Sequence, residues 1–291
     1  MKIINLPNFF LGQPDTCYII GDIGINHNGD LKIVKKLVQY AKVFDFNCVK
    51  FQKRNPDKCV PENQKNVMRE TPWGNMTYLD YKKKIEFNKE QYDEIFLICK
   101  NAQIDCSVSV WDIDSLNFIM NYDIPFLKIP SALITDLFFL KECALSKKPI
   151  IMSTGMSTIE EVDIAVNTIL KYNSDLSVLH CTSTYPCKIE ELNLRCIQMY
   201  IERYPDCVIG YSGHEFGLDT SVFAAALGAK IIERHITLDR MMWGTDQMAS
   251  VEPQGMYRLV RDIRLIFKAL GDGEKKLINS ELNIKTKLRG K

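Results

Sequence analysis

The chain alternates short apolar segments with longer stretches in which apolar residues recur every three or four positions. Eight of the short segments are rich in β-branched and other apolar residues, and they cover residues 17–21, 47–51, 104–108, 126–129, 149–152, 177–180, 208–210 and 230–233. Short apolar segments of this kind are typical of buried parallel strands, and amphipathic stretches between them are typical of βαβ crossovers. We therefore predict eight parallel strands with helices between them.

Several of the intervening stretches carry helix signals. Asp30 precedes a segment, 33–41, whose apolar residues share one helical face, and its side chain suits an N-cap. Ser157 and Glu160 have the spacing of a capping box before another amphipathic segment. A further amphipathic segment covers 257–270 and is followed by glycine. These signals indicate that the chain alternates strand and helix along most of its length.

Eight strands with helices between them favour a closed (β/α)₈ barrel, the TIM barrel, over a doubly wound open sheet. The 291 residues suit one decorated barrel, although two smaller domains would also fit this length. We predict a catalytic barrel over residues 1–275 and a polar tail over residues 276–291. The segment at about 53–88, after the second strand, is long and carries aromatic residues, so we expect an ordered flap over the barrel mouth.

Charge and cysteine content narrow the class of protein. With 37 basic and 36 acidic residues, the chain is nearly neutral, which favours neither nucleic acid nor a membrane surface as a partner. No apolar run approaches the ~18–20 residues that span a bilayer, and the first residues lack a secretory-signal pattern. The ten cysteines form no CxxC pair and no Cys/His zinc spacing. We expect a cytoplasmic protein with reduced thiols.

All four histidines stand at the end of a predicted strand or shortly after one: His27, His180, His214 and His235. In a barrel these strand ends open on one face, where catalytic residues gather. His214 and His235 follow neighbouring strands and could share a divalent cation, although the pair alone is equally consistent with structural histidines. Neutral imidazole suits Mn, Fe, Co, Ni or Zn, and two protein ligands would leave positions for water and substrate oxygens.

Two lysines, Lys50 and Lys128, stand within otherwise apolar strands. A buried lysine is costly unless it is paired with an anion. Hydroxyl groups follow the same strand ends, at Ser109, Ser131, Ser153, Thr154, Thr182, Ser183, Tyr185 and Ser212. This combination predicts a phosphate or carboxylate site, although lysines that reach past the core to solvent are the alternative.

These residues lie in segments that resemble the sialic acid synthase family, the N-acetylneuraminate synthases and their relatives. The matching segments, in family order, are 21–29 (GDIGINHNG), 49–52 (VKFQ), 127–131 (LKIPS), 153–156 (STGM), 180–186 (HCTSTYP), 210–214 (GYSGH), 226–239 (ALGAKIIERHITLD), 244–246 (GTD) and 249–253 (ASVEP). They extend over nearly the whole chain, and the combination is specific although each segment alone is weak.

The resemblance implies a (β/α)₈ barrel enzyme, a transferase that condenses phosphoenolpyruvate with a sugar aldehyde and water. The aldehyde would be N-acetylmannosamine or a related hexose or hexosamine, and the products a sialic-acid-type nonulosonate and phosphate. The resemblance also implies a divalent metal on His214 and His235, manganese or magnesium, with cobalt as a further candidate, and a homodimer.

Individual roles follow from the matching positions. Phosphoenolpyruvate would be held by Lys50, Ser109, Lys128, Ser131, Ser153, Ser183 and Ser212. Gln52, Tyr185 and Asp246 match positions near the sugar, and Tyr185 and Asp246 are also candidates for the catalytic group. Asp22 matches the family's catalytic carboxylate, which would orient or deprotonate the attacking water or protonate the new alkoxide.

The chain departs from the family pattern in three ways. The family usually has glutamate at the position of Asp22, so this carboxylate is shorter by one carbon. Leu133 stands where many members have a glutamate that helps to hold the sugar. Many members carry a C-terminal antifreeze-like domain that supplies an arginine to the partner's site, and this sequence has no such segment. We therefore expect the phosphoenolpyruvate half of the reaction more firmly than a particular sugar.

Three other functions fit parts of the pattern. A Schiff-base aldolase or lyase would use one lysine of lowered pKa, such as Lys128, and no metal. The octulosonate and heptulosonate phosphate synthases share phosphoenolpyruvate chemistry, although the two-histidine pattern disfavours them. A non-catalytic sugar-binding barrel would tolerate the changes at Asp22 and Leu133, but the presence of both lysines and both histidines argues against it.

Overall fold

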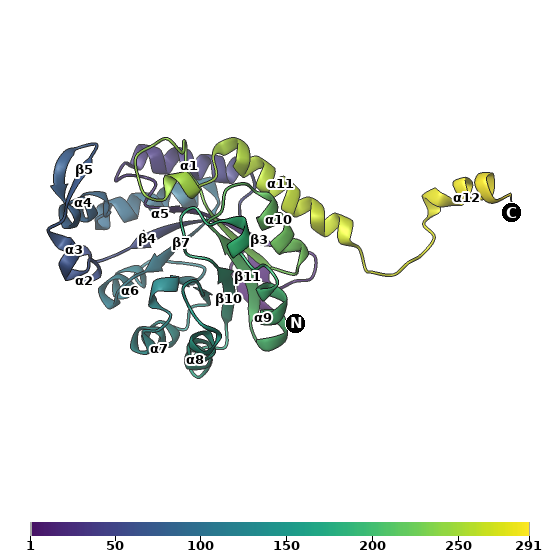
Figure 1. Ribbon diagram of the computed structural model, residues 1–291, viewed down its shortest axis with the longest axis horizontal. Coiled ribbons are helices and arrows are strands. Elements are labelled where there is room, and N and C mark those ends of the chain that lie inside the picture. The colour runs from purple at the N-terminus through teal and green to yellow at the C-terminus, as the bar shows by residue number, and fades with distance from the viewer. Residues whose placement is uncertain (1, 291) are drawn as a thin grey trace.

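The computed structural model describes residues 2–290, and its centre is a closed barrel of eight parallel strands (Figure 1). The strands are β3 (Tyr18–Gly24), β4 (Cys48–Lys53), β7 (Asp105–Val110), β8 (Leu127–Ile129), β9 (Ile150–Ser153), β10 (Leu176–Cys181), β11 (Val208–Gly213) and β12 (Ile231–His235). They pair in chain order, and β12 closes the ring against β3. The eight predicted strands and the predicted (β/α)₈ barrel are confirmed, and the doubly wound open sheet is wrong.

A helix follows each barrel strand before the next one begins. These helices are α1 (Leu31–Val43), α5 (Lys89–Ala102), α6 (Ile113–Ile119), α7 (Leu137–Leu145), α8 (Ile159–Leu170), α9 (Cys196–Arg203), α10 (Asp219–Ala226) and α11 (Pro253–Leu270). Their apolar faces pack on the outside of the strands in one continuous core. Because helices cover the outside and side chains fill the inside, the strands are buried on both faces, which explains their nearly continuous apolar sequences.

The helix starts follow the expected capping chemistry, with one correction. Asp30 caps α1, and its Oδ1 accepts a hydrogen bond from the backbone NH of Lys32 at 2.7 Å. The capping box of α8 consists of Thr158 and Glu161, so the predicted pair was placed one residue too early. The hydroxyl of Ser157 instead donates to the carbonyl oxygen of Gly155. Neighbouring Ser and Thr residues offer the same cap chemistry, and the local backbone decides between them.

The amino-terminal end of the barrel is closed by an antiparallel hairpin of β1 (Ile4–Leu6) and β2 (Phe9–Leu11). Ile4, Leu6 and Leu11 join a second apolar cluster inside the barrel. This cluster also contains inward side chains from at or near the start of the barrel strands, at Tyr18, Ile20, Cys48, Phe126, Ile151, Leu179, Val208 and Ile231. The half of the barrel at the amino-terminal ends of the strands is therefore a packed core. A polar site can form only at the carboxyl-terminal ends.

The long segment after β4 contains regular structure. It forms α2 (Pro56–Cys59), α3 (Glu62–Lys65), the antiparallel pair β5 (Met68–Thr71) and β6 (Gly74–Thr77), and α4 (Tyr78–Ile85). Tyr81 and Ile85 of α4 pack with Ile25 in a separate small core, to which Trp243 adds an edge-to-face contact with Tyr81. This segment thereby contacts the loops that follow β3 and β12.

Beyond α11, the chain leaves the barrel. Figure 1 shows an extended segment that leads to the short helix α12 (Leu282–Arg289), which lies away from the barrel. Three short 3₁₀ turns, η1 (Ser131–Leu133), η2 (Ile189–Glu191) and η3 (Gln247–Ala249), lie in the loops that follow barrel strands, and a fourth, η4 (Asn279–Glu281), precedes α12. Among residues 2–290, no helix is both long and apolar enough to cross a membrane.

Candidate active site

The polar site arises from the two-residue period of the strands. Along each strand, residues two apart point to the same side, so the positions after the buried inward residues also point into the barrel. In β3 the inward series runs Tyr18, Ile20 and Asp22, and in β12 it runs Ile231, Glu233 and His235. At the carboxyl ends the inward positions thus change from apolar to charged, which places the polar groups at the barrel mouth.

A cavity of about 180 Å³ opens at this mouth. It is lined by almost all of the residues that the sequence nominated, namely Asp22, Lys50, Gln52, Ser109, Lys128, Ser131, Ser153, Ser183, Tyr185, Ser212, His214 and His235. Asp246 lies in an adjoining cavity, together with Gln52 and Tyr185. Residues far apart in the sequence therefore share one site, as their positions at strand ends predict.

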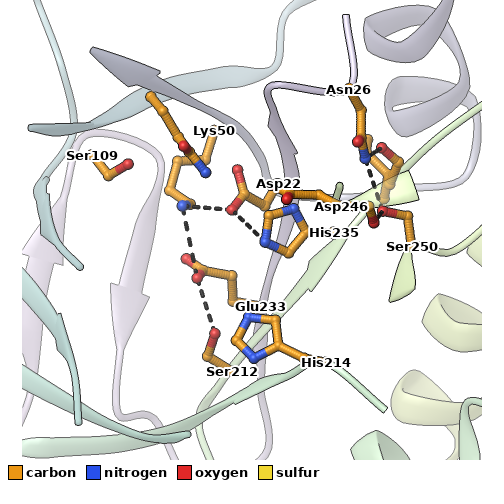
Figure 2. A network of polar contacts seen from close by, with 12 residues as sticks. Asp22, Asn26, Lys50, Ser109, Ser212, His214, Glu233, His235, Asp246 and Ser250 are labelled. Carbon is orange, nitrogen blue, oxygen red and sulfur yellow. Dashed lines mark hydrogen bonds and ion pairs between the residues drawn. The ribbon is translucent and has the colours of Figure 1, made fainter. Parts of the chain in front are cut away.

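The two lysines form one buried ionic cluster with two carboxylates, and Figure 2 shows Lys50 between Asp22 and Glu233. Lys50 Nζ lies 2.7 Å from Asp22 Oδ2 and 3.8 Å from Glu233 Oε1. Lys128 Nζ lies 3.6 Å from the same Glu233 oxygen and donates a hydrogen bond to Ser153 Oγ at 2.7 Å. Ser212 Oγ donates to Glu233 Oε1 at 3.1 Å. The lysines are thus held inside the barrel and do not reach past the core to solvent.

Burial and pairing act differently on the members of this cluster. Burial lowers the pKa of Lys50, but the carboxylates of Asp22 and Glu233 outweigh burial and leave that pKa above its ordinary value. Burial also lowers the pKa of Lys128, and the attraction of Glu233 does not restore it. Burial raises the pKa of Glu233, but Lys128, Lys50 and His235 bring it down to about 2. Lys128, which shares its carboxylate with Lys50, is therefore the ammonium group that gains most from a further anion.

Several hydroxyl groups line the cavity beside the lysines. Ser131 Oγ accepts a hydrogen bond from the backbone NH of Gly155 at 2.9 Å, which fixes the loop after β9 against the 3₁₀ turn η1. A Cβ atom added to Gly155 would lie 2.1 Å from Ser183 Oγ, so glycine is needed for this close approach. Two ammonium groups and several hydroxyls that line one small cavity suit a phosphate or carboxylate ligand.

His214 and His235 face each other with ring centroids 5.5 Å apart. His214 Nδ1 lies 2.8 Å from the carbonyl oxygen of Thr182, so in the neutral imidazole Nδ1 carries the proton and Nε2 keeps its lone pair. His235 Nε2 lies 3.3 Å from Asp22 Oδ2, and its buried Nδ1 has no hydrogen-bond partner among the described residues. Two imidazoles that share an ion at ~2.1 Å can have centroids up to roughly 6.5 Å apart. The pair therefore fits a divalent cation held by two protein ligands.

The described residues contain no group of three or more His, Cys, Asp and Glu side chains arranged for a metal ion. A metal here would depend on water or substrate oxygens for its remaining ligands, which is the open arrangement of a catalytic site. The other two histidines do not line the cavity. His27 accepts a hydrogen bond from the backbone NH of Gly29 and stacks on Phe87 at 4.1 Å, and His180 Nε2 lies 2.6 Å from the carbonyl oxygen of Leu192.

A bulge in β3 brings the backbone close to the histidines. The register with β4 shifts between Asp22 and Gly24, and Gly24 has a φ of +53°. A Cβ atom at Gly24 would lie 3.0 Å from Gln52 Nε2 and 3.2 Å from Cε1 of His235. Both the backbone conformation and the available space therefore favour glycine. The bulge aims Asp22 between Lys50 and His235.

A second cavity, of about 320 Å³, adjoins the first. Gln52, Trp111 and Tyr185 line both cavities, so a bound molecule can extend from one to the other. The second cavity lies between the barrel mouth and the segment from α2 to α4, with Asp246 near the histidines and Lys82 in its wall. Ser250 Oγ donates to the backbone carbonyl of Asp246 and accepts from Asn26 Nδ2, which holds this loop against the one after β3 (Figure 2).

The two substitutions relative to the family pattern have different structural consequences. Asp22 still reaches Lys50 and His235, so its shorter side chain keeps contact with both. Leu133 packs against the core outside the strands and lines neither cavity. The change at Leu133 therefore removes a carboxylate without adding a new side chain to the site.

Three residues of the site escaped sequence reasoning. Glu233 bridges the two lysines, Trp111 lines both cavities, and Cys181 Sγ lies 3.8 Å from His214 Nδ1. The period-two pattern carried the signal for Glu233, because it stands two residues before His235 on the same face of β12. Trp111 and Cys181 gave no such signal, because apolar residues at strand ends are common.

A (β/α)₈ barrel with paired lysines, clustered serines and two open imidazoles at its mouth defines a barrel enzyme that acts on anionic small molecules. The chain belongs to the NeuB family, whose model matches residues 37–275. It is 36% identical to human N-acetylneuraminate-9-phosphate synthase over 97% of this chain and 79% of that protein. It is 35% identical to N,N'-diacetyllegionaminic acid synthase of Legionella pneumophila over 96% of this chain and 80% of that one.

Among solved structures, the N-acetylneuraminic acid (sialic acid) synthetase of Leptospira borgpetersenii is similar along the whole barrel. It superposes with a TM-score of 0.88 at 30% identity and covers 100% of this chain and 98% of its own. The predicted membership of the sialic acid synthase family is therefore confirmed. These relatives are synthases of sialic-acid-type sugars, and this chain is an enzyme of the same class.

Proposed function

We propose that this enzyme condenses phosphoenolpyruvate with a sugar aldehyde and water to give a nonulosonate and inorganic phosphate, with the help of a divalent metal. The observation that carries the proposal is the shared mouth of the barrel, where two buried ammonium groups and two imidazoles line one cavity that continues into a second. The first cavity suits a compact trianion such as phosphoenolpyruvate. The second suits a polyhydroxylated aldehyde.

Lys50, Lys128 and the serines would hold the phosphate and carboxylate of phosphoenolpyruvate. The carboxylate nearest to Lys128, that of Glu233, is shared with Lys50, so the positive charge of Lys128 is only partly neutralised. This supports the role. Binding would replace part of the interaction with Glu233 by direct contact with the ligand. The fixed ammonium groups would also offset the charge on the departing phosphate.

His214 and His235 would hold the metal, which when bound supplies Lewis-acid activation of the aldehyde. C3 of phosphoenolpyruvate forms the new carbon–carbon bond to the aldehyde carbon, and water adds at C2. Asp22, which contacts Lys50 and His235, would take the proton of that water or return one to the new alkoxide. The resulting tetrahedral centre expels phosphate by cleavage of its C–O bond. Gln52, Tyr185 and Asp246 would orient the sugar so that the two carbons meet.

The test is phosphate release from phosphoenolpyruvate by the purified protein, with a panel of hexoses and hexosamines and with manganese, magnesium or cobalt. We expect phosphate release that requires both a sugar and a metal. The product should have the combined mass of the sugar and pyruvic acid. No release with any sugar and metal would overturn the proposal.

The same assay separates the rival chemistries. A Schiff-base aldolase would keep its activity in a chelator and would form a borohydride-trapped adduct, for which Lys128 is the candidate. Loss of activity in the chelator without an adduct would exclude it. Manganese as the native ion, a homodimer and a cytoplasmic location stay predictions of the family resemblance, and metal analysis and sedimentation of the purified enzyme test the first two.

A further inference from the structure

Two cations line the second cavity, Lys82 and Arg54, and the side chain of neither forms an ion pair among residues 2–290. Lys82 of α4 is only 9% exposed, and its Nζ takes part in no ion pair or hydrogen bond among residues 2–290. Its nearest aromatic neighbours are the rings of Tyr78 and Tyr81, whose centroids lie 5.3 Å and 5.2 Å from Nζ. A buried ammonium group is normally paired, so the absence of a partner within this part of the chain calls for an explanation.

Arg54 lines the same cavity. Its guanidinium stacks on Trp111 at 3.9 Å, and Nη2 donates to Gln52 Oε1 at 2.5 Å. Its Nε is buried and has no partner among the described residues. The stacking fixes the guanidinium plane, so its terminal N–H donors keep one orientation.

The carboxylates of the cavity are already engaged elsewhere. Glu86 accepts from Lys53 Nζ at 2.6 Å, and its side chain also accepts from the backbone NH of Arg54. Asp246 accepts from Thr245 Oγ1 at 2.7 Å and faces His235 at the end near the first cavity. Burial, with the nearby charge of Arg54, lowers the pKa of Lys82 to about 8, because the attraction of Asp246 and Glu86 does not offset them. Lys82 and Arg54 therefore remain able to bind a further anion in this cavity.

The direction of the bound sugar follows from the reaction. The aldehyde must lie near His214 and His235, and the shared wall of Gln52, Trp111 and Tyr185 leads from there into the second cavity. The end of the sugar remote from the aldehyde then lies within the second cavity, which Lys82 and Arg54 line. Because condensation adds three carbons at C1 of the acceptor, C6 of a hexosamine becomes C9 of the product.

We infer that the acceptor carries a phosphate monoester at the end remote from its aldehyde, and that Lys82 and Arg54 bind this phosphate. This inference rests on the proposed function for the position of the aldehyde. It addresses a choice that similarity leaves open, because the human relative is named for a 9-phosphate product and the Legionella relative is not, at nearly equal identity. The unpaired cations favour the phosphorylated substrate.

The experiment compares N-acetylmannosamine 6-phosphate with N-acetylmannosamine as acceptors, with phosphoenolpyruvate and metal present. We expect kcat/KM to be at least about tenfold higher for the phosphorylated sugar, the size of one charge-assisted hydrogen bond. The Lys82→Met variant should lower this ratio at least about tenfold. The matched control is Lys83→Met, which removes an exposed lysine of the same helix, paired with Asp57, and should leave the ratio unchanged.

Equal or better turnover of the unphosphorylated sugar by the unaltered enzyme would overturn the inference while the proposed function stands. Preference for the C6 carboxylate analogue, N-acetylmannosaminuronic acid, would show an anion subsite but not a phosphate subsite and would likewise overturn it. If no sugar is turned over, the proposed function fails, and calorimetric binding of the sugar phosphate without phosphoenolpyruvate decides the subsite. Binding that Lys82→Met weakens supports the subsite, and binding that it leaves unchanged refutes it.

Discussion

Replacement of Glu233 by glutamine tests the electrostatics of the site at its centre. Glu233 is 4% exposed and is shared by Lys50 and Lys128, and Glu233→Gln keeps the size of the side chain while it removes the charge. The two ammonium groups would then remain buried with only Asp22 as a counterion. Breaking a buried charge cluster in this way is strongly destabilising, because the remaining charges lose compensation.

The expected loss in the free energy of unfolding follows from the pKa of the Glu233 carboxyl group. Its fall from 4.5 to about 2 in the folded protein corresponds to about 3 kcal/mol, at about 1.4 kcal/mol per pH unit. Because the folded pKa lies below the unfolded one, this stabilisation is fully present above about pH 4.5 and is lost as the pH falls through about 2. At pH 7 the variant should therefore lose the whole contribution, which lowers the melting temperature by roughly 5–10 °C in a domain of this size.

Phosphoenolpyruvate should change the result in a diagnostic way. If the ligand supplies negative charge to the same lysines, it should raise the melting temperature of Glu233→Gln more than that of the unaltered protein. Differential scanning fluorimetry with and without phosphoenolpyruvate measures both effects. The matched control is Glu215→Gln, which removes a buried carboxylate that lies 3.0 Å from Arg234 and outside the site.

The control should be destabilised but should show an ordinary response to phosphoenolpyruvate. A Glu233→Gln variant as stable as the unaltered protein would refute the electrostatic reasoning. A ligand response equal to that of Glu215→Gln would refute the placement of phosphoenolpyruvate beside the two lysines.

Three further predictions concern the metal, the first substrate and the second. His235→Ala should abolish turnover and lower the metal content measured by mass spectrometry, whereas His180→Gln, outside the site, should keep its metal; unchanged metal in His235→Ala would contradict the ligand assignment. Lys50→Ala should raise KM for phosphoenolpyruvate at least about tenfold or abolish activity, because it removes a charged contact, and normal kinetics would exclude that role. Finally, kcat/KM for the phosphorylated acceptor should fall as the pH rises through about 8, because Lys82 of the free enzyme loses its charge there; a pH profile without that fall, or the same fall in Lys82→Met, would count against this role.

Much of the fold could be predicted from the sequence, because the local pattern of apolar residues agrees with the burial of each element in the barrel. The eight barrel strands are short, apolar and β-branched, and this composition is required of strands buried on both faces. The hairpin of β1 and β2 was missed, because its three-residue strands are too short to show a period. The cap of α8 was misplaced by one residue for a similar local reason, since Ser157 and Thr158 offer equivalent side chains.

The candidate site was readable in part. The sequence indicated Lys50 and Lys128 because a lysine in an apolar strand is costly to bury without an anion. It indicated the histidines because they stand at or just after strand ends. Glu233 was overlooked although it shares its strand face with His235. Arg54 and Lys82 could not be found at all, since each stands among other basic residues and neither differs from a solvated charge until its surroundings are known.

By itself, the sequence determined which residues form strands and helices and which polar groups stand at strand ends, because these depend on periodicities along the chain. Only the tertiary structure decided which of those groups meet. Closure of β12 onto β3 brings His235 beside Asp22, and the segment from α2 to α4 brings Lys82 into the cavity that Arg54 also lines. Whether a charge is paired, shared or left without a partner depends on distances across the barrel, and electrostatic interaction depends on separation in space and on burial, which the order of residues does not contain.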